Sequence, residues 1–99
     1  MKMSLKNYGT EGEVLMQGRL DSTTADDVEE LLVSLVPRFD RIILNLSGVN
    51  YVSSAGLSVF RLLHIAMRKK GGHLVFKDTP RLVMEIFTLT GYLHLFEFI

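Results

Sequence analysis

The 99-residue chain is long enough for one domain with one hydrophobic core, and 47% hydrophobic with 22% charged residues is an ordinary globular composition. Eleven basic residues balance eleven acidic ones, so a nucleic acid, whose backbone attracts basic proteins, is a poor candidate partner. The lack of cysteine excludes disulfides, thiol catalysis and thiolate metal sites, and no apolar run suits a signal peptide or a bilayer-spanning helix. We therefore expect a single cytoplasmic domain over residues 1–99, with no direct membrane insertion.

The N-terminal third of the chain predicts a hairpin and then a helix. A weakly patterned segment is followed by a turn at residues 10–13 and by a strand at residues 14–18. Thr24, with Asp27 three residues later, has the form of a helix N-cap. Apolar residues then recur at helical spacing until Pro37 ends the helix.

The central part of the chain predicts a buried strand and a long helix. Residues 41–46 are a short apolar run rich in β-branched residues, as in a strand covered on both faces. Residues 47–50 have the composition of a loop. A helix is expected from Ser53 or Ser54 to about Lys70, where cationic residues and two glycines follow, as they do at helix C-termini.

The C-terminal third predicts a strand, a helix and a short edge strand. The strand covers residues 73–77, Pro80 opens a helix that ends near Gly91, and residues 95–99 form the edge strand. The order β-β-α-β-α-β-α-β predicts an α/β fold with a mixed, mostly parallel sheet and right-handed crossovers. Binding sites in such sheets form where strands end and helices begin, which here means residues 20–24 and 49–56.

The segment from Ile42 to Leu57 is the most specific in the chain. It contains a strand, Asn45, a loop and then Ser-Ser-Ala-Gly-Leu at the start of a helix. In these residues, and in Gly18-Arg19-Leu20-Asp21, Gly71-Gly72 and Thr90-Gly91, the chain resembles the STAS family. That family comprises the domain of bacterial anti-sigma-factor antagonists and of sulfate-transporter tails, and the resemblance covers nearly the whole chain.

The resemblance implies a phosphorylation site. Ser54 matches the serine that the partner kinase of the family phosphorylates, and Ser53 stands where the family usually has an acidic residue. Ser53 is therefore a second candidate. The residues expected to surround the phosphosite are Asp21, Thr24, Asn45 and Gly56.

The chemistry of a serine at a helix start agrees with this implication. A phosphate there carries a charge of about −1.5 to −2 and would lie at the positive end of the helix dipole. A partner packed over that end would have to bury the dianion, which is costly. The alternative interpretation is that Ser53 and Ser54 only cap the helix.

The long helix has two contrasting sides. One side forms a core stripe of Gly56, Val59, Phe60, Leu63, Ala66 and Met67. The other side predicts a partner-binding face that consists of Ser54, Leu57, Ser58, Arg61, Ile65 and Arg68. Neighbouring elements could instead cover Leu57, and His64 is expected on the helix surface.

Patterns typical of enzymes and metal sites are missing. The three histidines, His64, His73 and His94, have no metal-ligand spacing. The Val52–Gly56 segment lacks the first glycine of a hydrolase elbow, and no glycine loop opens a helix to cradle a phosphate. We therefore expect no enzymatic activity, no cofactor and no metal.

By resemblance, the leading hypothesis is an anti-sigma-factor antagonist. Its unphosphorylated form would bind a serine-kinase anti-sigma factor and thereby regulate transcription. The kinase would inactivate it through Ser54, and a metal-dependent serine phosphatase would restore it. The alternative is a STAS subunit of a membrane transport complex that docks on an ATPase without phosphorylation. A third possibility, a small-ligand or hydrolytic domain, has no supporting constellation of residues.

Overall fold

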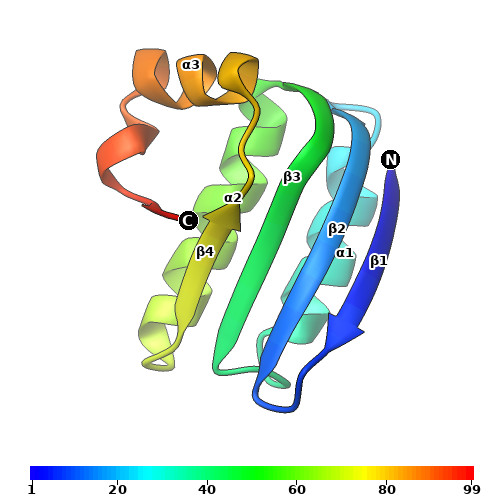
Figure 1. Ribbon diagram of the computed structural model, residues 1–99, viewed down its shortest axis with the longest axis vertical. Coiled ribbons are helices and arrows are strands. Elements are labelled where there is room, and N and C mark those ends of the chain that lie inside the picture. The colour runs from blue at the N-terminus through cyan, green and yellow to red at the C-terminus, as the bar shows by residue number, and fades with distance from the viewer.

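A five-stranded mixed sheet forms the centre of the computed structural model, which describes all 99 residues. The elements in chain order are β1 (Lys2–Asn7), β2 (Glu11–Leu20), α1 (Ala25–Leu35), β3 (Arg41–Val52), α2 (Ser54–Lys69), β4 (His73–Lys77), α3 (Arg81–Thr90), the 3₁₀ turn η1 (Tyr92–His94) and β5 (Glu97–Phe98). The strands lie in the order β1-β2-β3-β4-β5 (Figure 1). Only the β1–β2 pair is antiparallel, so the predicted mixed, mostly parallel sheet is confirmed.

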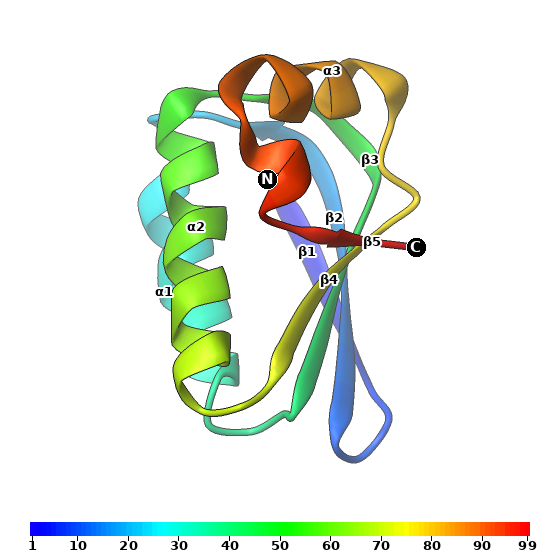
Figure 2. The same cartoon turned by 90° about the vertical axis from the view of Figure 1, so that its left-hand side faces the viewer.

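The helices are unevenly distributed around the sheet. Helices α1 and α2 lie side by side over one face, and α3 lies across the carboxyl ends of the strands, against β3 (Figures 1 and 2). The opposite face carries no helix (Figure 2). This arrangement brings the end of β2, the end of β3 and the start of α2 to one end of the molecule.

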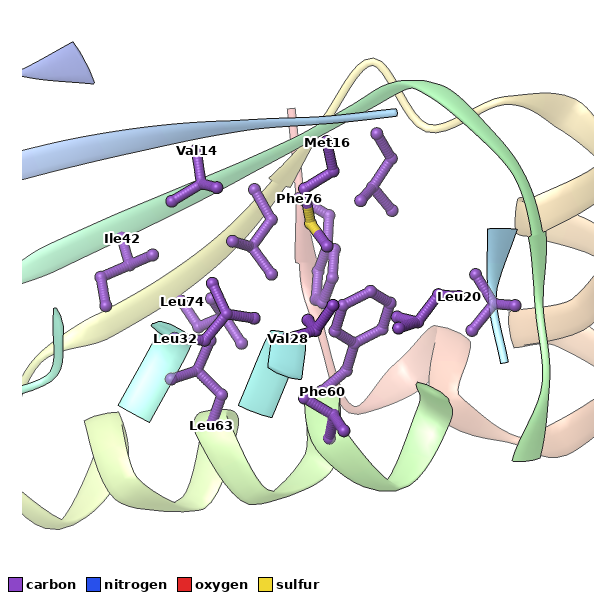
Figure 3. Packing of buried hydrophobic residues seen from close by; sticks show 14 of the residues in the cluster. Val14, Met16, Leu20, Val28, Leu32, Ile42, Phe60, Leu63, Leu74 and Phe76 are labelled. Atoms are coloured by element: carbon purple, nitrogen blue, oxygen red, sulfur yellow. The ribbon is translucent and has the colours of Figure 1, made fainter. Parts of the chain in front are cut away.

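The core lies between the sheet and the α1–α2 layer. Alternate strand residues such as Val14, Ile42 and Phe76 point toward Leu32 of α1 and Phe60 of α2 and are fully buried (Figure 3). Period-two alternation on the strands and a 3.6-residue period on the helices give each element one apolar side. The apolar side of the sheet packs against the apolar sides of the helices. The expected buried position of residues 42–46 is confirmed.

Strand β3 continues through the residues that were expected to form a loop. Residues 47–50 belong to the strand. Two irregularities in the pairing of β3 with β2 accommodate them. From Leu15 to Gln17, β2 advances two residues while β3 advances three, from Asn45 to Gly48. A second extra residue, Asn50, lies between the partners of Gly18 and Arg19. Each irregularity locally increases the bend and twist of the strand, and the loop-like composition reflects these bulges.

Gly48 shows why a small residue is needed at the first irregularity. A Cβ atom at this position would lie 2.6 Å from the Gln17 Cγ and 2.9 Å from the Met16 carbonyl oxygen. The glycine therefore permits close approach of the two backbones, while Val49 and Val52 further along β3 enter the core.

The predicted helix boundaries agree with the structure to within about one residue. Pro37 lies just beyond α1, and Pro80 occupies the N-cap of α3 instead of its first turn. Gly91 ends α3 with a φ of 82°, the left-handed conformation that glycine adopts readily. The edge strand at the C-terminus is shorter than expected, since it consists of Glu97 and Phe98 only.

Candidate phosphorylation and partner-binding site

The end of β2 and the start of α2 are in direct contact. The Ser53 N–H donates a hydrogen bond of 2.8 Å to the Leu20 carbonyl oxygen. A Cβ atom at Gly56 would lie 2.6 Å from the Leu20 Cγ and 3.0 Å from the Leu20 carbonyl oxygen. Because Gly56 has no side chain, the first turn of α2 can pack directly against Leu20. The two turns that the sequence singled out are therefore neighbours.

Ser53 and Ser54 have different positions at this junction. Ser53 is extended and is the N-cap of α2, and its hydroxyl oxygen accepts a 3.4 Å hydrogen bond from the Gly56 N–H. Ser54 is the first helical residue, and its exposed side chain has no hydrogen-bond partner within the chain. The capping role thus belongs to Ser53, and the Ser54 hydroxyl is the one that another protein can reach.

The first turn of α2 is electrostatically suited to an anion. It contains no acidic residue that would neutralise the positive end of the helix dipole. The first four backbone N–H groups at a helix start have no intrahelical partner. Here the Ser53 N–H is bonded to the Leu20 carbonyl oxygen, and the Gly56 N–H makes only the long cap hydrogen bond. A negative group attached to Ser54 would be stabilised by both effects.

The Asp21 turn lies beside this junction and is internally bonded. The Asp21 Oδ1 accepts hydrogen bonds from the Thr23 hydroxyl at 2.6 Å and from the Thr23 N–H at 3.0 Å. These bonds, together with Arg19, whose Nε lies 3.5 Å from the Asp21 Oδ2, lower the pKa of the Asp21 carboxyl. Asp21 is therefore a fixed negative charge next to the start of α2.

Thr24 supports the same turn instead of capping its helix. It is the N-cap residue of α1, but its side chain makes no cap hydrogen bond. The Thr24 hydroxyl donates to the Arg19 carbonyl oxygen at 3.0 Å and accepts from the Asp21 N–H at 3.1 Å. The predicted capping arrangement of Thr24 with Asp27 was wrong, because the hydroxyl is already bonded to the preceding turn.

Arg19 and Tyr51 were not predicted as part of this region. The Arg19 guanidinium lies 4.5 Å from the centre of the Tyr51 ring, and the two residues are paired partners in β2 and β3. Their contact depends on the second irregularity of β3, which no sequence pattern reveals. Arg19 thus lies between an aromatic ring and the Asp21 carboxylate.

Asn45 does not belong to the predicted cluster. It is buried in the middle of β3, donates from Nδ2 to the Glu13 Oε2 at 3.2 Å and accepts at Oδ1 from the Ser47 N–H at 3.0 Å. It pairs with Leu15, five positions before Leu20, so it lies roughly 16 Å along the sheet from the junction. The prediction failed because β3 extends well beyond Asn45.

The predicted partner-binding face is exposed in part, and its role in binding stays a prediction. Four of its members beyond Ser54 are exposed on α2, namely Ser58, Arg61, Ile65 and Arg68. Leu57 is only 4% exposed and packs in the core, so its assignment to this face was wrong. The angular offset of Leu57 from the core stripe is small enough for neighbouring elements to cover it.

His64 is also buried, contrary to the expectation that it lies on the surface. It is 8% exposed, and its ring is edge-on to Phe96 at 5.6 Å between centroids. Burial, with a further contribution from the nearby Arg68 charge, lowers the pKa of the imidazole. The segment after α3 therefore covers one flank of α2.

The similarity to a known family extends over nearly the whole sequence. A model of the STAS domain family matches residues 4–99. The chain belongs to the STAS domain family. The resemblance noted in the central strand and helix thus extends over nearly the full chain, and this STAS domain has the fold of its family.

Three relatives illustrate the similarity. The BtrV protein of Bordetella bronchiseptica, named as an anti-sigma factor antagonist, is 34% identical over 82% of this chain and 71% of its own length. The anti-sigma-B factor antagonist of Bacillus subtilis is 26% identical over 92% of this chain and 84% of its own. The antagonist SpoIIAA, solved in an unphosphorylated and a phosphorylated form, has 13% identity, with TM-scores of 0.84 and 0.78. Both forms align with 99% of this chain, and this chain covers 88% and 89% of theirs.

Two further features bear on the site. None of the helices in this STAS domain combines the length and the apolar character needed to cross a membrane. No three carboxylate or imidazole side chains come together in a group that could hold a metal ion.

Proposed function

We propose that this STAS domain is an anti-sigma-factor antagonist that binds a serine-kinase anti-sigma factor and is switched off by phosphorylation of Ser54. The observation that carries the proposal is the position of Ser54, exposed and unbonded at the first residue of α2. The names of the relatives support the regulatory role, and one of these relatives, SpoIIAA, exists in a phosphorylated form.

The physical basis of the switch is a difference between the free protein and its complex. In the free protein, the start of α2 accommodates a phosphate on Ser54, so the fold survives modification. In a complex that covers this end of the helix, the dianion loses water and lies close to the Asp21 carboxylate. Phosphorylation therefore weakens binding without unfolding the protein.

The proposal also defines the partners and the location of the protein. The domain is a substrate of the kinase and has no catalytic activity of its own. A metal-dependent serine phosphatase reverses the modification. All of these proteins act where transcription takes place, so the proposed location is the cytoplasm.

The test compares Ser54→Ala, Ser54→Asp and Ser53→Ala with the wild type. Each protein is incubated with the cognate serine-kinase anti-sigma factor and ATP, phosphate is located by tandem mass spectrometry, and affinity is measured by calorimetry. We expect label on Ser54 only and at least a tenfold loss of affinity in the phosphorylated protein, which corresponds to about 1.4 kcal/mol. Ser54→Asp should reproduce part of this loss, because a carboxylate carries less charge than a phosphate.

The Ser53→Ala variant is the matched control. It removes the N-cap, which costs about 0.5–2 kcal/mol of stability, but it leaves the Ser54 hydroxyl available for phosphorylation. Label on Ser53 alone would move the switch by one residue. Normal binding with no label on either serine would contradict the switch. The protein would then dock constitutively, as in the transport-complex alternative.

A further inference from the structure

A groove runs along the exposed side of α2, between this helix and the segment that follows η1. It has a cavity volume of about 520 Å³. Its lining residues are Arg61, His64, Ile65, Arg68, Lys69 and Leu95. Leu95, which directly follows η1, is the lining residue that lies opposite α2.

The groove concentrates positive charge that the chain does not neutralise. Arg61, Arg68 and Lys69 form no ion pair, and none of them donates a side-chain hydrogen bond within the chain. The chain as a whole has no net charge, so three unpaired cations in one groove are a local excess. The resulting positive potential attracts anionic groups.

The effect of this charge is visible at the wall of the groove. The pKa of the buried His64 is lowered first by burial and then by the Arg68 charge, whereas Glu97 acts in the opposite direction. Glu97 belongs to β5 and lies 3.3 Å from the His73 Nδ1, so it is already engaged outside the groove. No carboxylate of the chain lines the groove itself.

The groove also contains apolar surface. Ile65 is 38% exposed and Leu95 is 41% exposed, and both line it together with the cations. A free phosphate ion gains nothing from such side chains. A peptide segment that carries both acidic and aliphatic residues gains from the charges and from the apolar contact.

The spacing of the cations gives the groove a length scale. Arg61 and Arg68 are seven residues apart on α2, which is two helical turns or about 10.5 Å along the axis. Ile65 lies between them. An acidic helix with carboxylates seven residues apart and an apolar residue between them matches this pattern.

We propose that the groove receives an acidic segment of the anti-sigma factor, in which two carboxylates pair with Arg61 and Arg68 and an aliphatic side chain contacts Ile65 and Leu95. This assignment rests on the proposed function and specifies the chemistry of the part of the predicted partner-binding face that lies beyond Ser54 along α2. The phosphate acts at the N-terminus of α2, and the groove holds the partner along the rest of the helix.

The first experiment measures binding of the anti-sigma factor to the Arg61→Glu/Arg68→Glu double variant. We expect at least a tenfold weaker affinity and, for the wild type, an affinity that falls as ionic strength rises. The matched control is Lys2→Glu/Lys6→Glu, which makes the same charge change at exposed positions of β1. Circular dichroism of each variant checks that the fold is retained.

The outcomes separate this inference from the proposed function. Equal affinity of wild type and the Arg61/Arg68 variant overturns the groove assignment and leaves the proposed function intact. A loss of affinity in the Lys2/Lys6 control of the same size also overturns it, because the effect then comes from net charge. Failure of the wild type to bind any anti-sigma factor overturns the proposed function.

A second experiment tests the groove without that partner. A short helical peptide with glutamates seven residues apart and leucines between them is titrated into the labelled protein and followed by NMR. We expect saturable shifts at Arg61, Ile65, Arg68 and Leu95, and their loss with a glutamine version of the peptide. Shifts scattered over the surface, the same shifts with the glutamine peptide, or no shifts, contradict the assignment. The same shifts with inorganic phosphate alone identify a small-anion site in place of a peptide site.

Discussion

Gly56 is the residue that fixes the geometry of the proposed switch. The Leu20 side chain and carbonyl oxygen occupy the space that a Cβ atom at position 56 would need. Leu20 is fully buried, so it has little freedom to move aside. The close approach of the Asp21 turn to the start of α2 therefore requires a residue without a Cβ atom at position 56.

Replacing Gly56 by alanine should destabilise the protein. Overpacking a filled site typically costs about 1–3 kcal/mol, and the better helix propensity of alanine returns at most about 1 kcal/mol. Because the added Cβ would also meet the Leu20 backbone carbonyl oxygen, we expect a cost in the upper half of this range. The net loss in the free energy of unfolding, measured by urea titration, should then be about 1–2 kcal/mol. Ser58→Ala, an exposed change on the same helix, should leave that value within about 0.5 kcal/mol. An unchanged or higher stability for Gly56→Ala would show that Leu20 yields easily.

At the residue scale, the sequence was sufficient for exposed positions that depend on one element only. Ser54, Arg61, Ile65 and Arg68 lie on the outer side of α2, as the helical period requires. Asn45 and His64 depend on how separate segments meet: one on the length of β3, the other on the segment that carries Phe96. Such long-range contacts leave no local pattern to read.

At the scale of elements, β3 connects the core to the site. Its first half supplies fully buried residues between β2 and β4, and its second half bends toward the start of α2. The pairing with both neighbouring strands makes the first half rigid. The irregular second half determines where the chain enters α2.

Leu44→Ala should therefore be one of the most costly changes in the chain. Leu44 is fully buried in the core cluster, and truncation of such leucines costs about 2–5 kcal/mol through lost transfer energy and the cavity left behind. Leu89→Ala is the matched control, because Leu89 is 86% exposed on α3. Urea titration of both variants measures the difference. Similar values for the two would mean that the first half of β3 does not anchor the core.

The types and order of the elements were predictable because each carries its own periodicity or boundary residues. The helices begin and end close to the expected positions, with a proline beyond α1 and glycine after α3. The continuation of β3 was not predictable. A Ser-Gly pair and an asparagine are usual in loops, and only pairing with β2 keeps them in a strand.

At the scale of the whole molecule, the C-terminal segment closes the core on one side. Phe96 contacts His64 of α2 and the rings of Phe76 and Phe87, so it joins three elements. His64 is thereby held in a buried and electropositive position. Protonation of the His64 imidazole therefore destabilises the folded protein relative to the unfolded chain.

The stability of the protein should consequently fall as the solution becomes mildly acidic. The folded-state pKa of His64 lies below its ordinary value of 6.5, so below about pH 6.5 the unfolded chain takes up a proton that the folded protein does not. Above this pH both states are neutral at His64 and the effect disappears. His64→Phe keeps a ring against Phe96 but removes the titration.

The measurement is the free energy of unfolding of wild type and His64→Phe between about pH 7.5 and pH 5.5, a range above the ordinary carboxyl titration. We expect the wild-type value to decrease relative to the variant as the pH falls. Parallel curves for the two proteins would mean that His64 is protonated equally in the folded and the unfolded chain.

The order of the strands in space is the same as their order along the chain. Every strand pairs with the one synthesised immediately before it, and no strand has to be inserted later between two others. On the ribosome, the β1–β2 hairpin can form first, and each following helix and strand then adds to an edge that already exists. Vectorial synthesis thus proceeds in the same direction as assembly of the sheet, and the end of β2 is already in place when Ser53 and Gly56 arrive to pack against it.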